Sequence, residues 1–353
     1  MEFIKMQGME DYEECLKFLK PKRIFIEREA LRYERARRIK EKFNNMSVSV
    51  KLIDSYQGLR GISVKSRREG YKEAKRTLVI GVKRSKKFQT CKPSAHYQLP
   101  LATSCPGMCV YCYLNTNLGK TPCVRAYVNI DEILEVARNY IKQRSPAKTL
   151  FEGAATSDPL PVEDFTGNLK ECINFFARES LGGFRFVTKF TNVDSLLGLN
   201  HEEKTKIRFS INTNFVLNRY EKNTPSLYRR LEAAAKIKNS GYPLGFLIAP
   251  IMNYPDWQQE YEELLKDLKK ELGDDKITFE LITHRYTTRA KNLINEVFPG
   301  NELPMLDEER QFKYGQFGYG KYVYPRETMS LMKNWFYEKI EKIFPKAKIE
   351  YFV

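Results

Sequence analysis

The sequence predicts an α/β protein organised around a partial (β/α)6 barrel of the TIM type, and three observations lead to this fold. Six strand-like runs alternate with helix-like stretches between residues 97 and 284, a pattern typical of parallel βαβ units. A closed barrel would need two more strands, so an open barrel fits better. A cysteine-rich loop at 104–113 follows the first strand, and the ends of barrel strands are where such folds carry their chemistry.

A small α/β region is predicted ahead of the barrel. The run 23–26 predicts a strand, a charged stretch from about 29 to 43 predicts a helix, and 48–53 and 77–82 predict two further strands. Residues 1–20 are expected to form a loosely attached leader. The predicted domains are therefore the leader at 1–20, a basic N-terminal region at 21–90, the barrel at 91–285 and a C-terminal region at 286–353.

The barrel elements follow from the alternation of short apolar runs with amphipathic stretches. The predicted strands cover 97–103, 149–156, 184–190, 206–212, 243–251 and 276–284. The predicted helices cover 131–142, 169–178, 225–239 and 258–272.

The C-terminal region is predicted to contain a β-hairpin. Residues 314–324 alternate glycine, aromatic and basic side chains, which indicates two strands around a glycine-containing turn. An amphipathic helix at 327–343 and a strand at 348–353 are predicted to follow.

The charge of the chain points to a polyanionic partner. The net charge is +16, and twelve basic residues lie between Arg60 and Lys92, opposed only by Glu69 and Glu73. Lysine and arginine side chains that meet phosphates release counterions, so this distribution favours nucleic acid. The alternative is a basic protein whose charges are merely solvated.

The sequence also indicates the cellular compartment of the protein. No run of about 18 apolar residues is present, so no transmembrane helix is expected. The N-terminal residues have no signal-peptide core, which favours the cytoplasm. The seven cysteines are odd in number and mostly clustered, which indicates a reducing compartment rather than a disulfide framework. A monomer is expected.

Three cysteines, Cys105, Cys109 and Cys112, have the spacing C-x3-C-x2-C. Three thiolates on one loop hold three irons of a [4Fe–4S] cluster and leave the fourth iron open for a small molecule. This spacing is the signature of radical S-adenosylmethionine (SAM) enzymes. A structural zinc site is the first alternative, but the nearest fourth ligands, Cys91, His96 and Cys123, complete no recognisable zinc pattern. Chance clustering of buried cysteines is the second.

Beyond the cysteine loop, the sequence resembles the spore photoproduct lyase family along nearly its whole length after the leader. The blocks that carry the resemblance are Lys92-Pro93-Ser94-Ala95, Cys112-Tyr113-Leu114, Thr156-Ser157-Asp158, Phe186-Val187-Thr188-Lys189, Arg208-Phe209-Ser210-Ile211-Asn212, Phe279-Glu280-Leu281-Ile282 and Gly320-Lys321-Tyr322-Val323-Tyr324.

The resemblance implies a DNA repair enzyme from the spore core of an endospore-forming bacterium. Its substrate would be double-stranded DNA containing 5-thyminyl-5,6-dihydrothymine, the spore photoproduct. It implies a [4Fe–4S] cluster, SAM as a regenerated cofactor, and a low-potential one-electron donor such as flavodoxin or ferredoxin. A 5′-deoxyadenosyl radical would remove hydrogen from C6 of the dihydrothymine, and the bond between the two bases would then break.

The resemblance also assigns cofactor residues by position. Cys105, Cys109 and Cys112 would ligate the cluster. Lys189 would pair with the SAM carboxylate, as suits a positioned ammonium group. Ser157 and Ser210 would hydrogen-bond SAM, and Ala249 would bring backbone near the adenosine, although a strand-end lysine is often only solvated and serines often cap helices. Tyr111 and Tyr113 would relay a hydrogen atom toward SAM, with simple packing as the alternative.

The sequence departs from the family at one position. Ala155 stands where the family usually has the cysteine that gives hydrogen to the thymine allylic radical. Cys91 is our candidate replacement, because it immediately precedes the block that enters the first strand, and the alternative is a thiol without a role. The other cysteines are less suitable candidates: Cys15 in the leader, Cys123 elsewhere in the chain and Cys172 in an outer helix.

The hairpin is the element expected to meet DNA. Lys313, Lys321 and Tyr322 are the candidate contacts, because basic and aromatic side chains suit phosphates and bases. Family members often carry arginine where Gln316 stands, and the alternative is a hairpin that only covers the barrel. Two rival functions remain open at this point: a radical SAM enzyme that modifies RNA, and a noncatalytic iron–sulfur protein that binds DNA.

Overall fold

The computed structural model describes residues 19–46, 48–56, 65–114, 118–119, 122–273, 276–314, 318 and 320–353. The chain divides into two compact units. Unit 1 comprises Met1–Gly107 and Leu118–Lys206, and unit 2 comprises Met108–Asn117 and Ile207–Val353. Among the described residues, no helix has the length and apolar character needed to cross a membrane. The expected leader lies almost entirely outside these residues.

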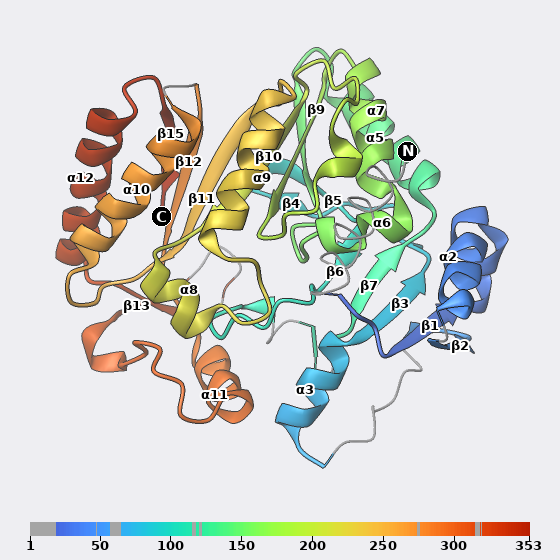
Figure 1. Cartoon of the computed structure of the whole chain (residues 1–353), viewed down its shortest axis with the longest axis horizontal. Coiled ribbons are helices and arrows are strands. Elements are labelled where there is room, and N and C mark those ends of the chain that lie inside the picture. The colour runs from blue at the N-terminus through green and yellow to red at the C-terminus, as the bar shows by residue number, and fades with distance from the viewer. Residues whose placement is uncertain are drawn as a thin grey trace, which may run out of the picture. The chain divides into compact units, whose positions relative to one another are not determined.

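Unit 1 begins with a five-stranded sheet in the order β2-β1-β3-β7-β6. The neighbouring strands are parallel except for the pair β6 and β7. Figure 1 shows α2 beside β1 and β2. The elements are β1 (Arg23–Glu27), η1 (Arg28–Arg32), α2 (Glu34–Asn45), β2 (Ser49–Ile53), α3 (Arg67–Lys75), β3 (Thr77–Gly81), β6 (Ala102–Thr103) and β7 (Val124–Tyr127).

Helix α3 was not predicted, although the sequence contains its start signal. Ser66 accepts a hydrogen bond from the Glu69 backbone N–H at 3.2 Å, and the Glu69 carboxylate accepts one from the Lys65 N–H at 3.0 Å. This pair is a variant of the capping box, in which the Glu69 carboxylate bonds the residue before the N-cap. It starts a helix inside the basic segment, so the basic side chains there are spaced by helical geometry.

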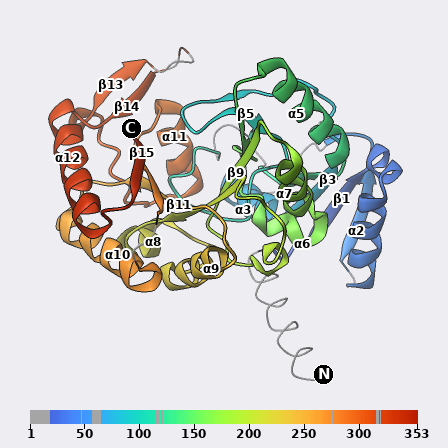
Figure 2. The same ribbon diagram turned by 90° about the horizontal axis from the view of Figure 1, so that it is seen from above.

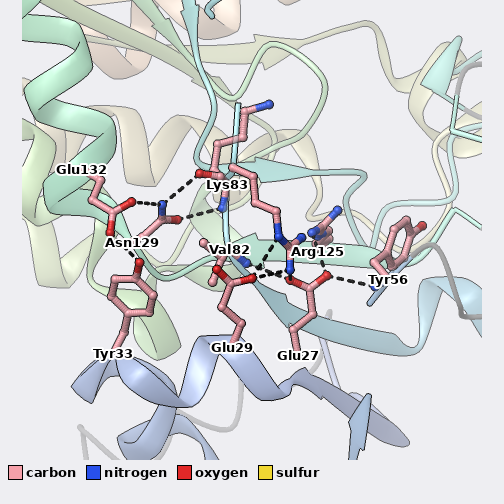
Figure 3. Close-up of polar contacts among 10 residues, drawn as sticks. Glu27, Glu29, Tyr33, Tyr56, Val82, Lys83, Arg125, Asn129 and Glu132 are labelled. Atoms are coloured by element: carbon pink, nitrogen blue, oxygen red, sulfur yellow. Dashed lines mark hydrogen bonds and ion pairs between the residues drawn. The ribbon is translucent and has the colours of Figure 1, made fainter. Parts of the chain in front are cut away.

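Glu27, the last residue of β1, is a buried carboxylate that gathers Arg125 of β7 and residues that follow β2 and β3 (Figure 3). Glu27 is fully buried and accepts hydrogen bonds from the backbone N–H groups of Tyr56 (2.9 Å) and Val82 (3.1 Å). It also pairs with Arg125 at 3.1 Å and Arg84 at 3.2 Å. Burial by itself would raise the pKa of Glu27, but these hydrogen bonds and charges together lower it.

A second set of strands in unit 1 runs in the order β9-β8-β5-β4. One face of this sheet is aromatic and packs against helices: Phe176 stacks on Phe184 with ring centroids 5.4 Å apart, and it also contacts Phe151. The elements are β4 (Thr90–Cys91), β5 (Ala95–Leu99), α5 (Ile130–Arg144), β8 (Thr149–Gly153), η3 (Leu160–Val162), α6 (Glu163–Thr166), α7 (Asn168–Arg178), β9 (Gly182–Thr188) and η4 (Asp194–Leu196).

The predicted strand at 97–103 is wrong in its extent. Strand β5 ends at Leu99, and β6 belongs to the other sheet, where Ala102 pairs with Ala126 of β7. Pro100 separates the two strands, and proline has no N–H to continue a ladder. This switch of sheet directs the chain into the cysteine loop.

Unit 2 contains parallel strands in the order β15-β12-β11-β10. Strand β10 begins in the last residues of unit 1 and continues into unit 2. Helices α10 and α12 lie side by side in Figure 2. The elements are β10 (Thr205–Ile211), α8 (Asn214–Tyr220), α9 (Leu227–Asn239), β11 (Leu244–Ile251), α10 (Trp257–Leu272), β12 (Thr278–Thr283), α11 (Thr288–Val297), η5 (Asp307–Glu309), β13 (Gln311–Tyr314), β14 (Gly320–Val323), α12 (Arg326–Ile343) and β15 (Lys348–Phe352).

The unit 2 sheet has one aromatic face and one polar face. Phe246 and Phe279 contact each other, and Phe279 also contacts Phe344 beyond α12. On the polar face, Arg208 pairs with Glu280 at 2.8 Å. Gly245 makes room for Arg208, because a Cβ atom there would lie 3.1 Å from its Cγ atom. The polar face of the unit 2 sheet therefore carries a buried ion pair instead of apolar side chains.

Candidate active site

The cysteine loop is divided between the two units, and each part makes backbone hydrogen bonds within its unit. Cys105 belongs to unit 1, where the preceding Ser104 N–H donates to the Thr156 carbonyl at 2.9 Å. Cys109 and Cys112 belong to unit 2, and the Cys112 N–H donates to the Cys109 carbonyl at 3.2 Å. Among the described residues, no three histidine, cysteine, aspartate or glutamate side chains are gathered as a metal site.

The residues of this loop nevertheless fit an iron–sulfur cluster by their chemistry. Three thiols stand on one short segment, and thiolates are the ligands that such clusters require. Cys123 and Cys172 are unsuitable, because burial raises the pKa of Cys123 to about 11 and that of Cys172 well above the ordinary value. Cys105 also lies beside a buried cation, since the Lys75 ammonium donates to the Cys105 carbonyl at 3.0 Å.

In unit 1, Ser157 and Lys189 are tied to the same loop by one buried carboxylate, Asp158. The Ser157 hydroxyl donates to the Ser104 carbonyl. Asp158 accepts from the Lys189 backbone N–H at 2.7 Å and from the Thr188 hydroxyl at 3.0 Å. Burial raises the pKa of Asp158 to about 6. Asp158 thus orders the end of β9 that carries Lys189, a role that our reading of the Thr-Ser-Asp block missed.

In unit 2, a buried chain of polar groups leads from the cysteine loop to Ser210. The Tyr111 hydroxyl donates to Glu221, and the other Glu221 oxygen pairs with Arg230 at 2.6 Å. Arg230 donates in turn to the Ser210 carbonyl at 2.8 Å. Burial, followed by the Glu221 charge, raises the pKa of Tyr111 well above the ordinary value. No sequence pattern identified Glu221 or Arg230.

The remaining candidates differ in exposure. Tyr113 is 55% exposed, whereas Tyr111 is partly buried and begins the chain of polar groups described above. Ala249 lies in β11 and is half-buried, directly before Pro250. Ser210 lies in β10 and is buried.

Cys91 and Ala155 lie at different levels of the sheet in unit 1. Cys91 is opposite Ala95 at the start of β5, whereas the Ala154 N–H, next to Ala155, bonds the Leu99 carbonyl at the other end. Four residues of strand span about 13 Å. The turn after Cys91 reaches the polar face of the sheet, because the Ser94 hydroxyl donates to Glu152 at 2.6 Å.

The predicted hairpin forms, but its first strand, β13, begins at Gln311, before the predicted range 314–324, and two of its basic residues are opposite each other. Lys313 is directly opposite Lys321, while Tyr322 stacks on Tyr286 with ring centroids 5.3 Å apart. Burial lowers the pKa of Lys321, and the charges of Arg285 and Lys313 lower it further. Like charges directly opposite destabilise a hairpin by themselves, so this arrangement favours an anionic partner. Gln316 lies outside the described residues.

Comparisons with known proteins agree over nearly the whole chain. The family model for spore photoproduct lyase matches residues 19–353. A relative from Clostridium acetobutylicum, described as spore photoproduct lyase, is 48% identical over 332 residues, which is 94% of this chain and 98% of the relative. A relative of the same description from Bacillus subtilis is 42% identical over 335 residues, with the same coverage.

Solved structures give the same result. A spore photoproduct lyase double mutant with bound AdoMet and dinucleoside spore photoproduct has a TM-score of 0.93 at 42% identity, covering 95% of this chain and 99% of that one. A spore photoproduct lyase complexed with the dinucleoside spore photoproduct has a TM-score of 0.92, covering 94% and 99%. These matches confirm the predicted α/β partial-barrel fold. The chain therefore belongs to the spore photoproduct lyase family.

Proposed function

We propose that the chain is a radical SAM lyase that reverts spore photoproduct in DNA to two thymines. The observation that carries the proposal is the match of almost the whole chain, in sequence and in fold, to a lyase solved with AdoMet and a dinucleoside spore photoproduct. When bound, the cluster and SAM supply a 5′-deoxyadenosyl radical that takes hydrogen from C6 of the lesion, and SAM is re-formed at the end of turnover.

The residues that the family resemblance assigns to the cofactors hold them in this proposal. Cys105, Cys109 and Cys112 ligate the cluster. Lys189 pairs with the SAM carboxylate, and the buried Asp158 supports it, because the hydrogen bond to the Lys189 N–H orders the backbone there. Ser157, Ser210 and the Ala249 backbone contact the remainder of SAM.

Hydrogen return is assigned to Cys91, Tyr111 and Tyr113. After the bond between the bases breaks, Cys91 gives its thiol hydrogen to the thymine allylic radical. The tyrosines then give a hydrogen atom to the Cys91 thiyl and recover one from 5′-deoxyadenosine, so no hydrogen is gained or lost. Hydrogen leaves C6 of one base and a different hydrogen enters the methylene carbon of the other base, which restores its methyl group. The two transfers occur at different atoms, which is compatible with the different levels of Cys91 and Ala155. The solved double mutant likewise combines replacement of a cysteine by alanine with replacement of a serine by cysteine.

Double-stranded DNA is the proposed macromolecular partner. Lys313 and Lys321 are opposite each other on the hairpin and each contacts one DNA phosphate in this proposal, and Tyr322 lies next to them. Helix α3 adds a second basic surface, because Arg68 and Lys72 are exposed one turn apart while Glu73 is already engaged by Arg23 at 2.5 Å. A low-potential electron donor such as flavodoxin or ferredoxin, a monomeric state and the spore core of an endospore-forming bacterium complete the proposal.

The test of this function is an anaerobic assay of the reconstituted, reduced chain with SAM and a dinucleotide spore photoproduct. Conversion to two thymines, measured by chromatography with mass detection, is the expected result. Loss of conversion in Cys109→Ala, which lacks one cluster ligand, should accompany loss of iron. A chain with full iron content that cleaves no SAM would instead support the noncatalytic DNA-binding alternative.

The salt dependence of DNA binding tests the basic surfaces. The double variant Lys313→Gln and Lys321→Gln is expected to flatten the plot of log K against log salt by a slope of about 2, since each lost phosphate contact on B-DNA removes about 0.9. The double variant Arg68→Gln and Lys72→Gln should do the same. Binding to a lesion-free duplex is measured by fluorescence anisotropy at several salt concentrations.

The matched control removes two lysines from another helix. Lys266 and Lys270 are exposed on α10, and their replacement by glutamine alters the net charge equally. A slope that falls as much in this control as in the hairpin variant would contradict the assignment, because only the net charge would then matter.

A further inference from the structure

A lysine ammonium is buried at the beginning of the cysteine loop. Lys75, the last residue of α3, is 3% exposed. Its Nζ atom donates to the Ser104 hydroxyl at 3.1 Å and to the Cys105 carbonyl at 3.0 Å. Among the described residues, no carboxylate oxygen lies within 4.0 Å of this ammonium. Its partners are neutral.

A buried cation of this kind needs a negative charge near it. Transfer of an ammonium group from water into the protein interior is costly unless an opposite charge compensates for it. The Tyr71 ring, 5.2 Å from Nζ, supplies a partial cation–π contribution. Glu73, the acidic residue nearest in sequence, is engaged by Arg23 and by Lys22 at 3.7 Å. The Cys123 thiol near Lys75 stays protonated, because burial raises its pKa to about 11.

The position of Lys75 matches the place where negative charge would arise. Cys105 follows Ser104, whose φ of +60° places it in the left-handed region, and the Ser104 hydroxyl donates to the Pro122 carbonyl at 2.8 Å. This backbone is thus held firmly where the ammonium meets it. An iron–sulfur cluster with three thiolate ligands carries a net negative charge, which grows by one electron on reduction.

We propose that Lys75 is a positioning residue that also tunes the cluster: its buried charge stabilises the reduced state and so raises the reduction potential. The inference rests on the proposed function, in which Cys105 is a cluster ligand. The effect is electrostatic, because Lys75 contacts the Cys105 carbonyl and not an iron site, and charge acts strongly across a poorly solvated interior. The charges of Arg68 and Lys72 on the same helix are exposed and therefore screened by solvent.

The test compares neutral and charged replacements in the reconstituted holoenzyme. In Lys75→Met and Lys75→Gln, the ratio of reduced to oxidised cluster at a fixed potential is expected to fall about tenfold, which is 59 mV for a one-electron couple. Lys75→Arg keeps the charge and should retain most of the parent potential. The potential is measured by anaerobic redox titration with electron paramagnetic resonance, and the iron content is measured for each variant.

Lys83→Met is the matched control in the same unit. Lys83 is half-buried, and its Nζ lies 5.9 Å from the Tyr127 ring. Its replacement should leave the potential unchanged. A lower potential in both neutral variants but not in this control supports the proposal, whereas increased solvent access alone would raise the potential instead.

Several results would overturn the inference. An unchanged or raised potential in fully loaded neutral variants would do so, and so would an arginine variant shifted as far as the neutral ones. One further result would support the inference: neutral variants that have the melting temperature of the parent but bind no iron, while the arginine variant binds a full complement of iron, would show that a charge is needed at this position. Neutral and arginine variants that all fail to fold would reduce Lys75 to a structural role. Absence of a cluster in the unaltered chain would refute the proposed function itself.

Discussion

Clean repair of a dinucleotide spore photoproduct is expected to fall roughly tenfold or more in the Cys91→Ala variant, while SAM cleavage continues. Without a thiol to quench it, the thymine allylic radical persists and reacts with other donors. A tenfold loss corresponds to about 1.4 kcal/mol of barrier. Chromatographic separation of thymine products, with 5′-deoxyadenosine measured in the same reaction, distinguishes failed quenching from failed radical generation.

Two further variants sharpen this experiment. Cys123→Ala removes a buried thiol from unit 1 and should leave the product distribution unchanged. Adding Ala155→Cys to the Cys91→Ala chain should restore clean repair, because it returns a thiol to the position where the family usually carries one. If Cys91→Ala gives the parent yield and products, Cys91 has no role in hydrogen transfer.

The Glu27→Gln variant is expected to lose about 3–5 kcal/mol of unfolding free energy, the usual cost of breaking a buried ion pair. Glutamine retains the shape but leaves the Arg125 guanidinium, whose side chain is 14% exposed, without its counter-charge. Each carboxylate oxygen of Glu27 accepts one backbone N–H, from Tyr56 or from Val82, and glutamine keeps only one of these two acceptors (Figure 3). Urea unfolding followed by circular dichroism measures the loss.

The pH dependence of this difference has a definite sign. The folded-state pKa of Glu27 is below its ordinary value of 4.5, so the stabilisation is fully present above that value and is lost as the pH falls through the folded pKa. The gap between parent and Glu27→Gln should therefore narrow below about pH 4.5. Glu29→Gln is the control: Glu29 is 38% exposed and pairs with Arg84, so its loss should stay below about 1 kcal/mol.

The element pattern was largely readable from local sequence. Alternating apolar runs located β8 to β12, and the predicted α9 and α10 differ from the structure by one or two residues at their starts. The errors arose where tertiary pairing decides. Whether residues after Pro100 continue one strand or join another sheet depends on the partner β7, which was itself missed. The capping signal of α3 at Ser66 and Glu69 lies in a segment whose many basic residues suggest a charged surface more strongly than a helix.

The site shows the same division. The cysteine spacing, the family resemblance and the exchange at Ala155 are all properties of residues close in sequence or of an ordered set of motifs. The supporting residues are different. Glu221 and Arg230 bind Tyr111 and Ser210 across long stretches of chain, and Asp158 reaches β9 from the loop after β8.

The sequence by itself determined the family, and it predicted the chemistry from three thiols at cluster spacing and from a basic chain suited to DNA. Only the tertiary structure decided which groups compensate one another. In the sequence, Lys75 cannot be distinguished from the other cations of the basic segment. The fold buries it and brings its ammonium group to the Cys105 carbonyl. Burial removes water from a charge and makes its few neighbours decisive, and neighbours distant in sequence are brought together only by the fold.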